Sequence, residues 1–381
     1  MKQNNEEEHN KDKNSSKKRD KLAVSHLRSQ SVKPIEAQRP TLSRQELESV
    51  LDCLIQDKLG SGQIASRLEK AFATAFGYKH VLAVHSLASA YHLSMLALQI
   101  KKDDNVLMSA IAPVQAADAT RYVDASIEIL DIERNSFHPS DESIQNTVNE
   151  KNPSLYIMHH AFGSPDRVNI NFLKEKNIKI IEDITGLVGS EKNGEFFGNA
   201  GNIAVCGMSE YDLITTGNGA LIITSDSKLY QAMLSLRYGS KRTTGPAYDY
   251  RLEDFQAAMG LDQLSRLEQT LSRRKKIGQK YLETLRLTKH ETYFKEAGID
   301  SYIRFPVIIN KSHDEVEHYF RSLQIGIERA VDHPLHHLLG YPRLEFPNAE
   351  RLYQKAVSIP VYPALTANNV ERIASSLRGI L

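Results

Sequence analysis

Residues 80–122 read HVLAVHSLASAYHLSMLALQIKKDDNVLMSAIAPVQAADATRY. The stretch holds two short aliphatic runs, residues 80–84 and 105–108, and each is followed by a segment with helical spacing of apolar residues, 87–98 and 113–122. Short apolar runs that alternate with amphipathic helices are typical of a parallel sheet covered by its crossover helices. The stretch therefore predicts an α/β fold.

The same alternation continues on the C-terminal side of this stretch. Further strand candidates are residues 127–130, 155–158, 178–181, 203–206 and 220–224, and helical segments lie between them at 141–149, 170–176 and 228–236. With the first two runs this makes seven strand candidates. We expect one large, mostly parallel sheet flanked by helices.

The pattern changes after Asp249. Two long charged helices are predicted at 252–267 and 268–285, and a second, smaller α/β segment follows and ends in a helix at 368–381. We expect a large domain at 34–270 and a small C-terminal α/β domain at 271–381. Residues 1–33 are rich in charged and polar residues, which predicts a disordered charged tail.

Composition excludes several classes of function. Lys plus Arg number 48 against 47 Asp plus Glu, and the resulting net charge of +1 gives no overall attraction to nucleic acid or an anionic membrane. No apolar run approaches the roughly 18 residues of a membrane span. The two cysteines, Cys53 and Cys206, are far apart and lack metal-ligand spacing. We expect a cytoplasmic protein whose partner is a small molecule or another protein.

Several motifs occur in a characteristic order along the globular part. They include Gly60-Ser61-Gly62, His160-Ala161-Phe162-Gly163, Ile180-Ile181-Glu182-Asp183, Ile214-Thr215-Thr216-Gly217-Asn218-Gly219-Ala220, Tyr250-Arg251 and Ile359-Pro360-Val361-Tyr362-Pro363. In order and spacing they resemble the DegT family of nucleotide-sugar aminotransferases over roughly residues 40–381. The resemblance implies a fold-type I aminotransferase fold, with a seven-stranded large domain and a small C-terminal domain. It also implies the cofactor pyridoxal phosphate and an active site at a dimer interface.

One departure from the family pattern concerns its chemistry. Members of the family have a lysine two residues before the run Ile/Leu-Thr-Thr-Gly. This lysine bonds covalently to the cofactor aldehyde. Here that residue is Asp212, and Gly198 and Thr215 anchor the register without a gap. Because a carboxylate is not an amine, Asp212 cannot replace the Schiff-base lysine.

Other cofactor positions of the family also differ. The Gly-Thr pair of the phosphate loop corresponds to Leu87 and Ala88, and a phosphate-binding serine corresponds to Gly207. The remaining departures are Pro113 for an aromatic that stacks on the ring, Gly186 for a Gln or His at the ring hydroxyl, and Asp249 for an asparagine that reaches across the dimer.

Asp183 alone is retained, at the position that pairs with the pyridine nitrogen, although an aspartate at a strand end could equally bond loop amides. From these departures we expect that no cofactor is held and that no metal is bound.

The prediction that follows is a catalytically inactive DegT relative that acts by binding in nucleotide-sugar and surface-polysaccharide biosynthesis. It would form a homodimer or a heteromer with an active sugar-pathway enzyme, and a nucleotide sugar is a candidate ligand. Two alternatives stay open. One is a cofactor-independent nucleotide-sugar enzyme with Asp212 and Asp183 as acid and base, and the other is a residual pyridoxal-phosphate-dependent aminotransferase or dehydratase.

Further groups have more than one interpretation. Asp183, Asp212 and Asp249 would converge on one pocket, where they could hold a divalent cation or be bonded to arginines. His333, His336 and His337 have helix-like spacing, so a metal site or a sugar contact is open there.

Overall fold

The structure, a computed structural model, describes residues 33–238, 247–295, 298 and 300–380. The predicted tail therefore lies outside the described residues, except for Lys33. Among the described residues, no helix combines the length and the apolar character that crossing a bilayer requires.

The large sheet has seven strands in the order β1-β9-β8-β5-β4-β2-β3. The strands are β1 His80–Val84, β2 Asn105–Ser109, β3 Ser126–Leu130, β4 Leu155–His159, β5 Lys179–Asp183, β8 Ile203–Gly207 and β9 Ala220–Thr224. Only β9 runs antiparallel to its neighbours, β1 and β8. The predicted mostly parallel, seven-stranded sheet is confirmed.

Helices cover both faces of this sheet, as continuous apolar strands require. Along β1, Leu82 and Val84 pack in one core with α4 (Leu87–Ala97), whereas Val81 and Ala83 pack in a second core with α3 (Gln63–Phe76). The remaining helices around the sheet are α5 Val114–Tyr122, α6 Asp141–Lys151, α7 Ile170–Glu175 and α8 Ser227–Tyr238. The two-residue alternation of strand side chains thus builds a three-layer α/β unit.

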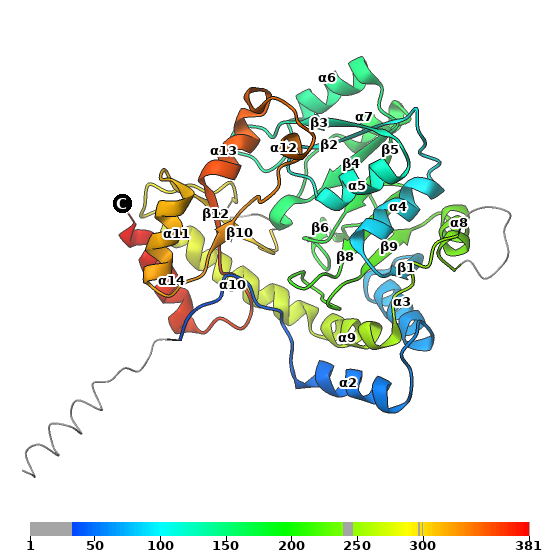
Figure 1. Cartoon of the computed structure of the whole chain (residues 1–381), viewed down its shortest axis with the longest axis horizontal. Coiled ribbons are helices and arrows are strands. Elements are labelled where there is room, and N and C mark those ends of the chain that lie inside the picture. The colour runs from blue at the N-terminus through cyan, green and yellow to red at the C-terminus, as the bar shows by residue number, and fades with distance from the viewer. Residues whose placement is uncertain (1–32, 239–246, 296–297, 299, 381) are drawn as a thin grey trace, which may run out of the picture.

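A smaller layer follows in the chain. Helices α9 (Asp254–Ser265) and α10 (Leu267–Leu285) lead to a three-stranded antiparallel sheet of β10 Phe305–Ile308, β12 Ala356–Ile359 and β11 Glu328–Arg329. In Figure 1, α10 runs from α9, near the large sheet, to this layer, where it lies beside α14. The other helices here are α11 His313–Ser322, α12 Leu335–Leu338, α13 Pro347–Lys355 and α14 Ala367–Gly379.

The N-terminal segment contacts both parts of the chain. Ile35 pairs with Ile325 beside the C-terminal layer, and α2 (Arg44–Ile55) packs on α9. The predicted domain limits at residues 34, 270 and 271 stay predictions.

Because six strands of the large sheet share one direction, their carboxyl ends lie at a single edge. Leu87 follows β1, Pro113 follows β2, Asp183 ends β5 and Gly207 ends β8. The carboxyl edge of a parallel sheet is where ligands usually bind. Chain topology thus brings most of the predicted site residues to one place.

Candidate functional site

Asp183 is buried at the end of β5, and both of its carboxylate oxygens accept hydrogen bonds from the chain. The Tyr91 hydroxyl, from α4, donates to Oδ2 at 2.6 Å, and the Thr185 amide donates to Oδ1 at 2.9 Å. Burial and the charge of Asp183 raise the pKa of Tyr91 well above its usual range, so the phenol stays a donor. The carboxylate therefore has the structural role of tying α4 and the following turn to β5. Each oxygen still keeps a lone pair for a further donor.

Asp212 lies half-buried in the turn that follows β8. Its Oδ2 accepts from the Ser209 amide at 2.6 Å, and its own amide donates to the Ser209 carbonyl at 3.1 Å. Burial raises the pKa of Asp212 from 3.8 to about 6; the charge of Asp183 adds to this, while hydrogen bonds from Ser209 and the charge of Arg304 oppose it. A carboxyl with such a pKa exchanges its proton near neutral pH.

Gly207 faces the Asp212 carboxylate. A Cβ at position 207 would lie 2.9 Å from Oδ2 of Asp212 and 3.2 Å from the Thr185 side chain. The Gly207 amide donates to the Thr185 hydroxyl at 2.8 Å. The aspartate at 212 and the glycine at 207 are therefore sterically matched.

Gly186 is packed against the turn that follows β4. A Cβ there would lie 2.8 Å from the Gly163 amide nitrogen and 3.1 Å from the His160 carbonyl oxygen. Backbone atoms therefore occupy the space that a side chain would need. Gln or His at position 186 would require this turn to move.

Leu87 and Ala88 are the first two residues of α4. Ser86 caps the helix, because its hydroxyl accepts from the Ser89 amide at 3.2 Å and the Ser89 hydroxyl accepts from the Ser86 amide at 3.1 Å. The helix N-terminus keeps the partial positive charge that favours an anion. Pro113 precedes α5 in the same way and presents no aromatic ring.

Asp249 lies apart from Asp183 and Asp212. Its side chain is 75% exposed and binds Arg251 at 2.7 Å and 3.1 Å, and this pairing lowers its pKa. The predicted convergence of all three carboxylates in one pocket is not seen within the described chain. Asp183 and Asp212 interact electrostatically, whereas Asp249 is held at the surface near His85.

The groups whose possible metal-ligand atoms lie within 4.8 Å of one another in the described chain are His336-His337-Glu350 and His313-Asp314-Glu317. Neither contains Asp183 or Asp212. In the first group, Nε2 of His336 and of His337 lie 3.1 Å and 2.6 Å from Oε2 of Glu350. A hydrogen-bonded structural cluster accounts for these contacts, and His333 is not part of it.

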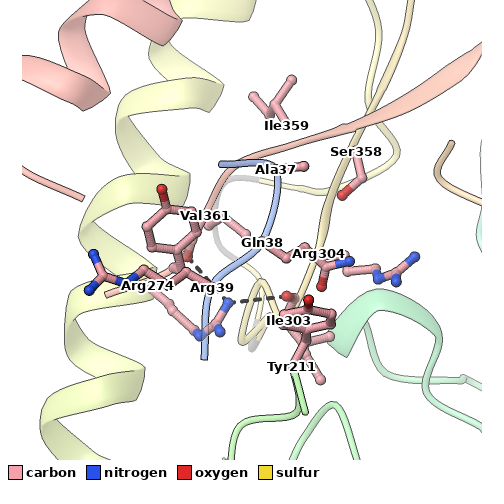
Figure 2. A pocket seen from close by; sticks show the side chains of 11 residues that line it. Ala37, Gln38, Arg39, Tyr211, Arg274, Ile303, Arg304, Ser358, Ile359 and Val361 are labelled. Carbon is pink, nitrogen blue, oxygen red and sulfur yellow. Dashed lines mark hydrogen bonds between the residues drawn. The ribbon is translucent and has the colours of Figure 1, made fainter. Parts of the chain in front are cut away.

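A small pocket of about 10 Å³ lies beside Tyr211, the residue before Asp212. Figure 2 shows Arg274 extending from α10 to the carbonyl oxygens of Ile303 and Val361, at 3.1 Å and 3.2 Å. Burial lowers the pKa of Arg274 to about 10, and the charge of Asp212 opposes this. Arg39 and Arg304 also line the pocket, so its wall is cationic.

The fold and this edge of the sheet define the class of fold-type I, pyridoxal-phosphate-dependent enzymes. Asp183 ends a central strand there, a helix N-terminus follows β1, and the Thr-Thr-Gly turn follows β8. The chain belongs to the DegT/DnrJ/EryC1/StrS aminotransferase family, whose model matches residues 40–378.

The chain is also similar to individual proteins over most of its length. The uncharacterized protein MJ1066 of Methanocaldococcus jannaschii is 24% identical over 377 residues, which cover 90% of this chain and 96% of that protein. The aminotransferase TlmJ from Streptoalloteichus hindustanus has a TM-score of 0.84 at 22% identity, covering 91% of this chain and 98% of that one. Spr1654 of Streptococcus pneumoniae, described as a sugar aminotransferase, has a TM-score of 0.82 at 18% identity in its pyridoxal-phosphate form, with coverage of 91% and 98%.

A third solved structure is that of a mutant of the GDP-4-keto-6-deoxymannose-3-dehydratase ColD with bound GDP-perosamine. It has a TM-score of 0.80 at 19% identity and covers 90% of this chain and all of the other.

The expectation that no cofactor is held is wrong. The family is one of pyridoxal-phosphate enzymes, and Spr1654 is known in both its pyridoxal-phosphate and pyridoxamine-phosphate forms. The expectation gave too much weight to single side chains, since an absent lysine would remove a covalent bond but leave the scaffold of the pocket. Asp183 would hold the pyridine nitrogen, and the amides of Leu87 and Ala88 at the start of α4 would face the phosphate.

When bound, pyridoxal phosphate supplies an electron sink. The roles assigned to Leu87, Ala88, Pro113, Gly186, Gly207, Asp212 and Asp249 stay predictions.

Two residues near this site are not indicated by the sequence motifs. Tyr91 lies inside the predicted helical segment 87–98, and His159 directly precedes the motif that begins at His160. Each matters through a partner that is distant in sequence, so no local motif indicates it.

Proposed function

We propose that this chain is a sugar-aminotransferase-like protein that binds a nucleotide sugar and does not perform lysine-dependent amino-group transfer. The observation that carries the proposal is Asp212, a carboxylate held by the Ser209 amide at 2.6 Å in the turn before the Thr-Thr-Gly motif. A carboxylate cannot condense with an aldehyde. Pyridoxal phosphate would then be held only by non-covalent contacts.

The wall of the small pocket beside Tyr211 is cationic, because Arg39, Arg274 and Arg304 line it. Its volume of about 10 Å³ suits a water molecule and not a diphosphate, so the nucleotide-sugar proposal does not rest on this pocket. ColD, of the same fold, has been solved with a GDP-linked sugar. We infer a nucleotide sugar as the ligand and, from the family resemblance, surface-polysaccharide biosynthesis as the setting.

A homodimer, or a heteromer with an active enzyme of the pathway, is the assembly we propose. Its support is an apolar stripe on α2, where Leu47, Leu51 and Ile55 are 68%, 50% and 71% exposed. A stripe of this kind marks a contact surface more often than a free one.

An amino-transfer assay tests the proposal. The full chain would be mixed with pyridoxal phosphate and L-glutamate, and the absorption spectrum followed with and without borohydride. We expect no pyridoxamine phosphate and no borohydride-fixed cofactor on wild-type protein. Asp212→Lys is the matched variant, since it restores an amine and should allow fixation at position 212. Formation of pyridoxamine phosphate by wild-type protein would refute the proposal.

A second candidate function is proton transfer on a nucleotide sugar by Asp212. The observation that favours it is the pKa of about 6, which suits a general acid or base at neutral pH. Turnover of a nucleotide-linked 4-keto sugar in the presence of pyridoxamine phosphate would support it, provided that Asp212→Asn abolishes turnover. Binding of the sugar without turnover supports the first proposal instead.

A further inference from the structure

His159 ends β4 directly beside Asp183. The two residues are paired in the register of parallel strands β4 and β5. Side chains at paired positions of neighbouring strands project to the same face of the sheet. The imidazole of His159 therefore lies on the face where Asp183 meets Tyr91, at the carboxyl edge.

Nδ1 of His159 is buried and has no hydrogen-bond partner among the described residues. Buried polar atoms in native proteins are nearly always bonded, so one without a partner calls for a ligand or a water. The residue as a whole is only half-buried, which places it at the border of open space. Burial lowers the pKa of His159 although the charge of Asp183 opposes this, so the ring is neutral at pH 7.

The next residue, His160, provides a contrast. Its Nδ1 accepts from the Asp166 amide at 2.9 Å, and its Nε2 donates to Glu182 at 3.2 Å. Both nitrogens of this fully buried ring are used within the chain. The unused hydrogen-bonding capacity therefore belongs to His159, on the opposite face of the sheet.

Gly186 is packed against the chain segment that follows His159. Its closest neighbours are Gly163 and the His160 carbonyl, which belong to the turn that directly follows His159. The family resemblance implies a Gln or His at position 186, whose side chain contacts the ring hydroxyl of the cofactor. Gly186 has no side chain that could make this contact. The segment that fills the space beside Gly186 therefore begins with the residue directly after His159.

We propose that His159 hydrogen-bonds the ring hydroxyl of pyridoxal phosphate and so takes over the contact that Gly186 cannot make. Together with Asp183 at the pyridine nitrogen, it orients a cofactor that has no covalent link to the chain. This inference rests on the non-covalent cofactor of the proposed function. It adds a binding residue that the sequence interpretation did not contain.

Equilibrium binding tests this inference on the full chain, with pyridoxal phosphate followed by spectroscopic titration. His159→Ala should weaken binding about tenfold, the effect of losing one hydrogen bond to a polar ligand. His159→Gln keeps a polar head group and should recover most of the affinity. His80→Ala, at the amino edge of the sheet, is the matched control and should bind like wild type.

The 3-deoxy analogue of the cofactor, which lacks the ring hydroxyl, localises the effect. It should bind wild type and His159→Ala equally, because the contact is absent from both complexes. The inference is overturned if His159→Ala binds pyridoxal phosphate as tightly as wild type, if its deficit persists with the analogue, or if wild type binds no cofactor. Formation of pyridoxamine phosphate from L-glutamate by wild type would instead refute the proposed function, so the two failures are distinguishable.

Discussion

Asp212 and Gly207 lie in direct contact at the carboxyl edge of the large sheet. The Asp212 carboxylate lies where a side chain at position 207 would be, since a Cβ added there would be 2.9 Å from its Oδ2. A side chain added at position 207 alone therefore meets the Asp212 carboxylate. The side chains that positions 207 and 212 can hold are therefore sterically coupled.

A paired substitution measures this coupling. Gly207→Ala should destabilise the wild-type background by ~1–3 kcal/mol, because the added methyl is overpacked against Asp212 and Thr185. In an Asp212→Ala background the same change should cost less, by ~1 kcal/mol or more of coupling. Urea unfolding of the four proteins gives the cycle. Additive effects of the two substitutions would contradict the steric match.

The raised pKa of Asp212 has a consequence for stability. Its folded-state pKa of about 6 lies above its ordinary value of 3.8, so the folded protein keeps a proton that the unfolded chain has lost in this window. Stability contributed by this group therefore falls as pH rises from about 4 to about 6.

Asp212→Asn removes this titration, so the free energy of unfolding of the variant should rise relative to wild type across the same window. The difference in the free energy of unfolding between variant and wild type is up to ~3 kcal/mol. Solvent screening reduces it, because Asp212 is partly exposed. Urea unfolding at pH 4.5 and at pH 7.5 provides the measurement. Parallel pH dependences for the two proteins would show that Asp212 does not carry the shift.

At the element scale, the hydrogen bond between Tyr91 and Asp183 fixes α4 to β5. Among the described residues, Tyr91 is the only side-chain donor to the buried carboxylate of Asp183. Tyr91→Phe removes this donor and should lower the free energy of unfolding by ~1–3 kcal/mol. The same change frees Asp183 to move, so cofactor affinity should change as well. Thermal unfolding and pyridoxal-phosphate titration measure the two effects.

Tyr156→Phe is the matched control for this variant. Tyr156 is equally buried and donates to Asp166 at 2.8 Å, on the other face of the sheet. We expect a similar loss of stability and unchanged cofactor affinity. Equal loss of affinity in both variants would mean that general destabilisation, and not the position of Asp183, is responsible.

The local sequence pattern predicts the strands of the large sheet but not the polar residues at their carboxyl ends. The strand predicted at 178–181 is observed as β5, which continues through the charged residues Glu182 and Asp183. Glu182 is buried there since His160 and the amides of Gly198 and Ala200 satisfy it. A hydropathy pattern ends a strand at its first charge, because the partners that allow a charge to be buried come from elsewhere in the chain.

The site was predictable only where it follows sequence motifs. The register around Gly198 and Thr215 led to Asp212, and the strand motif led to Asp183, and both site roles stay predictions. Tyr91 could not be connected with Asp183, because 92 residues separate them. His159 likewise meets Asp183 only through the pairing of β4 with β5, which no local spacing encodes.

For the whole molecule, the low net charge and the exposed apolar side chains of α2 are the two features that favour the proposed self-association. The net charge of +1 offers little mutual repulsion between copies. Among the described residues, six of the thirteen exposed large apolar side chains fall within positions 42–59, on and beside α2. Helix α2 buries Glu46 and Cys53, whereas its apolar residues Leu47, Leu51, Leu54 and Ile55 are exposed.

Leu47, Leu51 and Ile55 follow one another at four-residue spacing and form a single stripe on α2. If this stripe is the contact between two copies of the chain, Leu47→Glu with Ile55→Glu places two like charges at a desolvated interface from each copy and should shift the protein from dimer to monomer. Light scattering coupled to size-exclusion chromatography gives the mass. Leu344→Glu, at a position that is 93% exposed in the C-terminal layer, controls for added charge and should remain dimeric. A dimer that survives the double substitution would place the interface elsewhere, since no dimer could keep these carboxylates buried and unpaired at no cost.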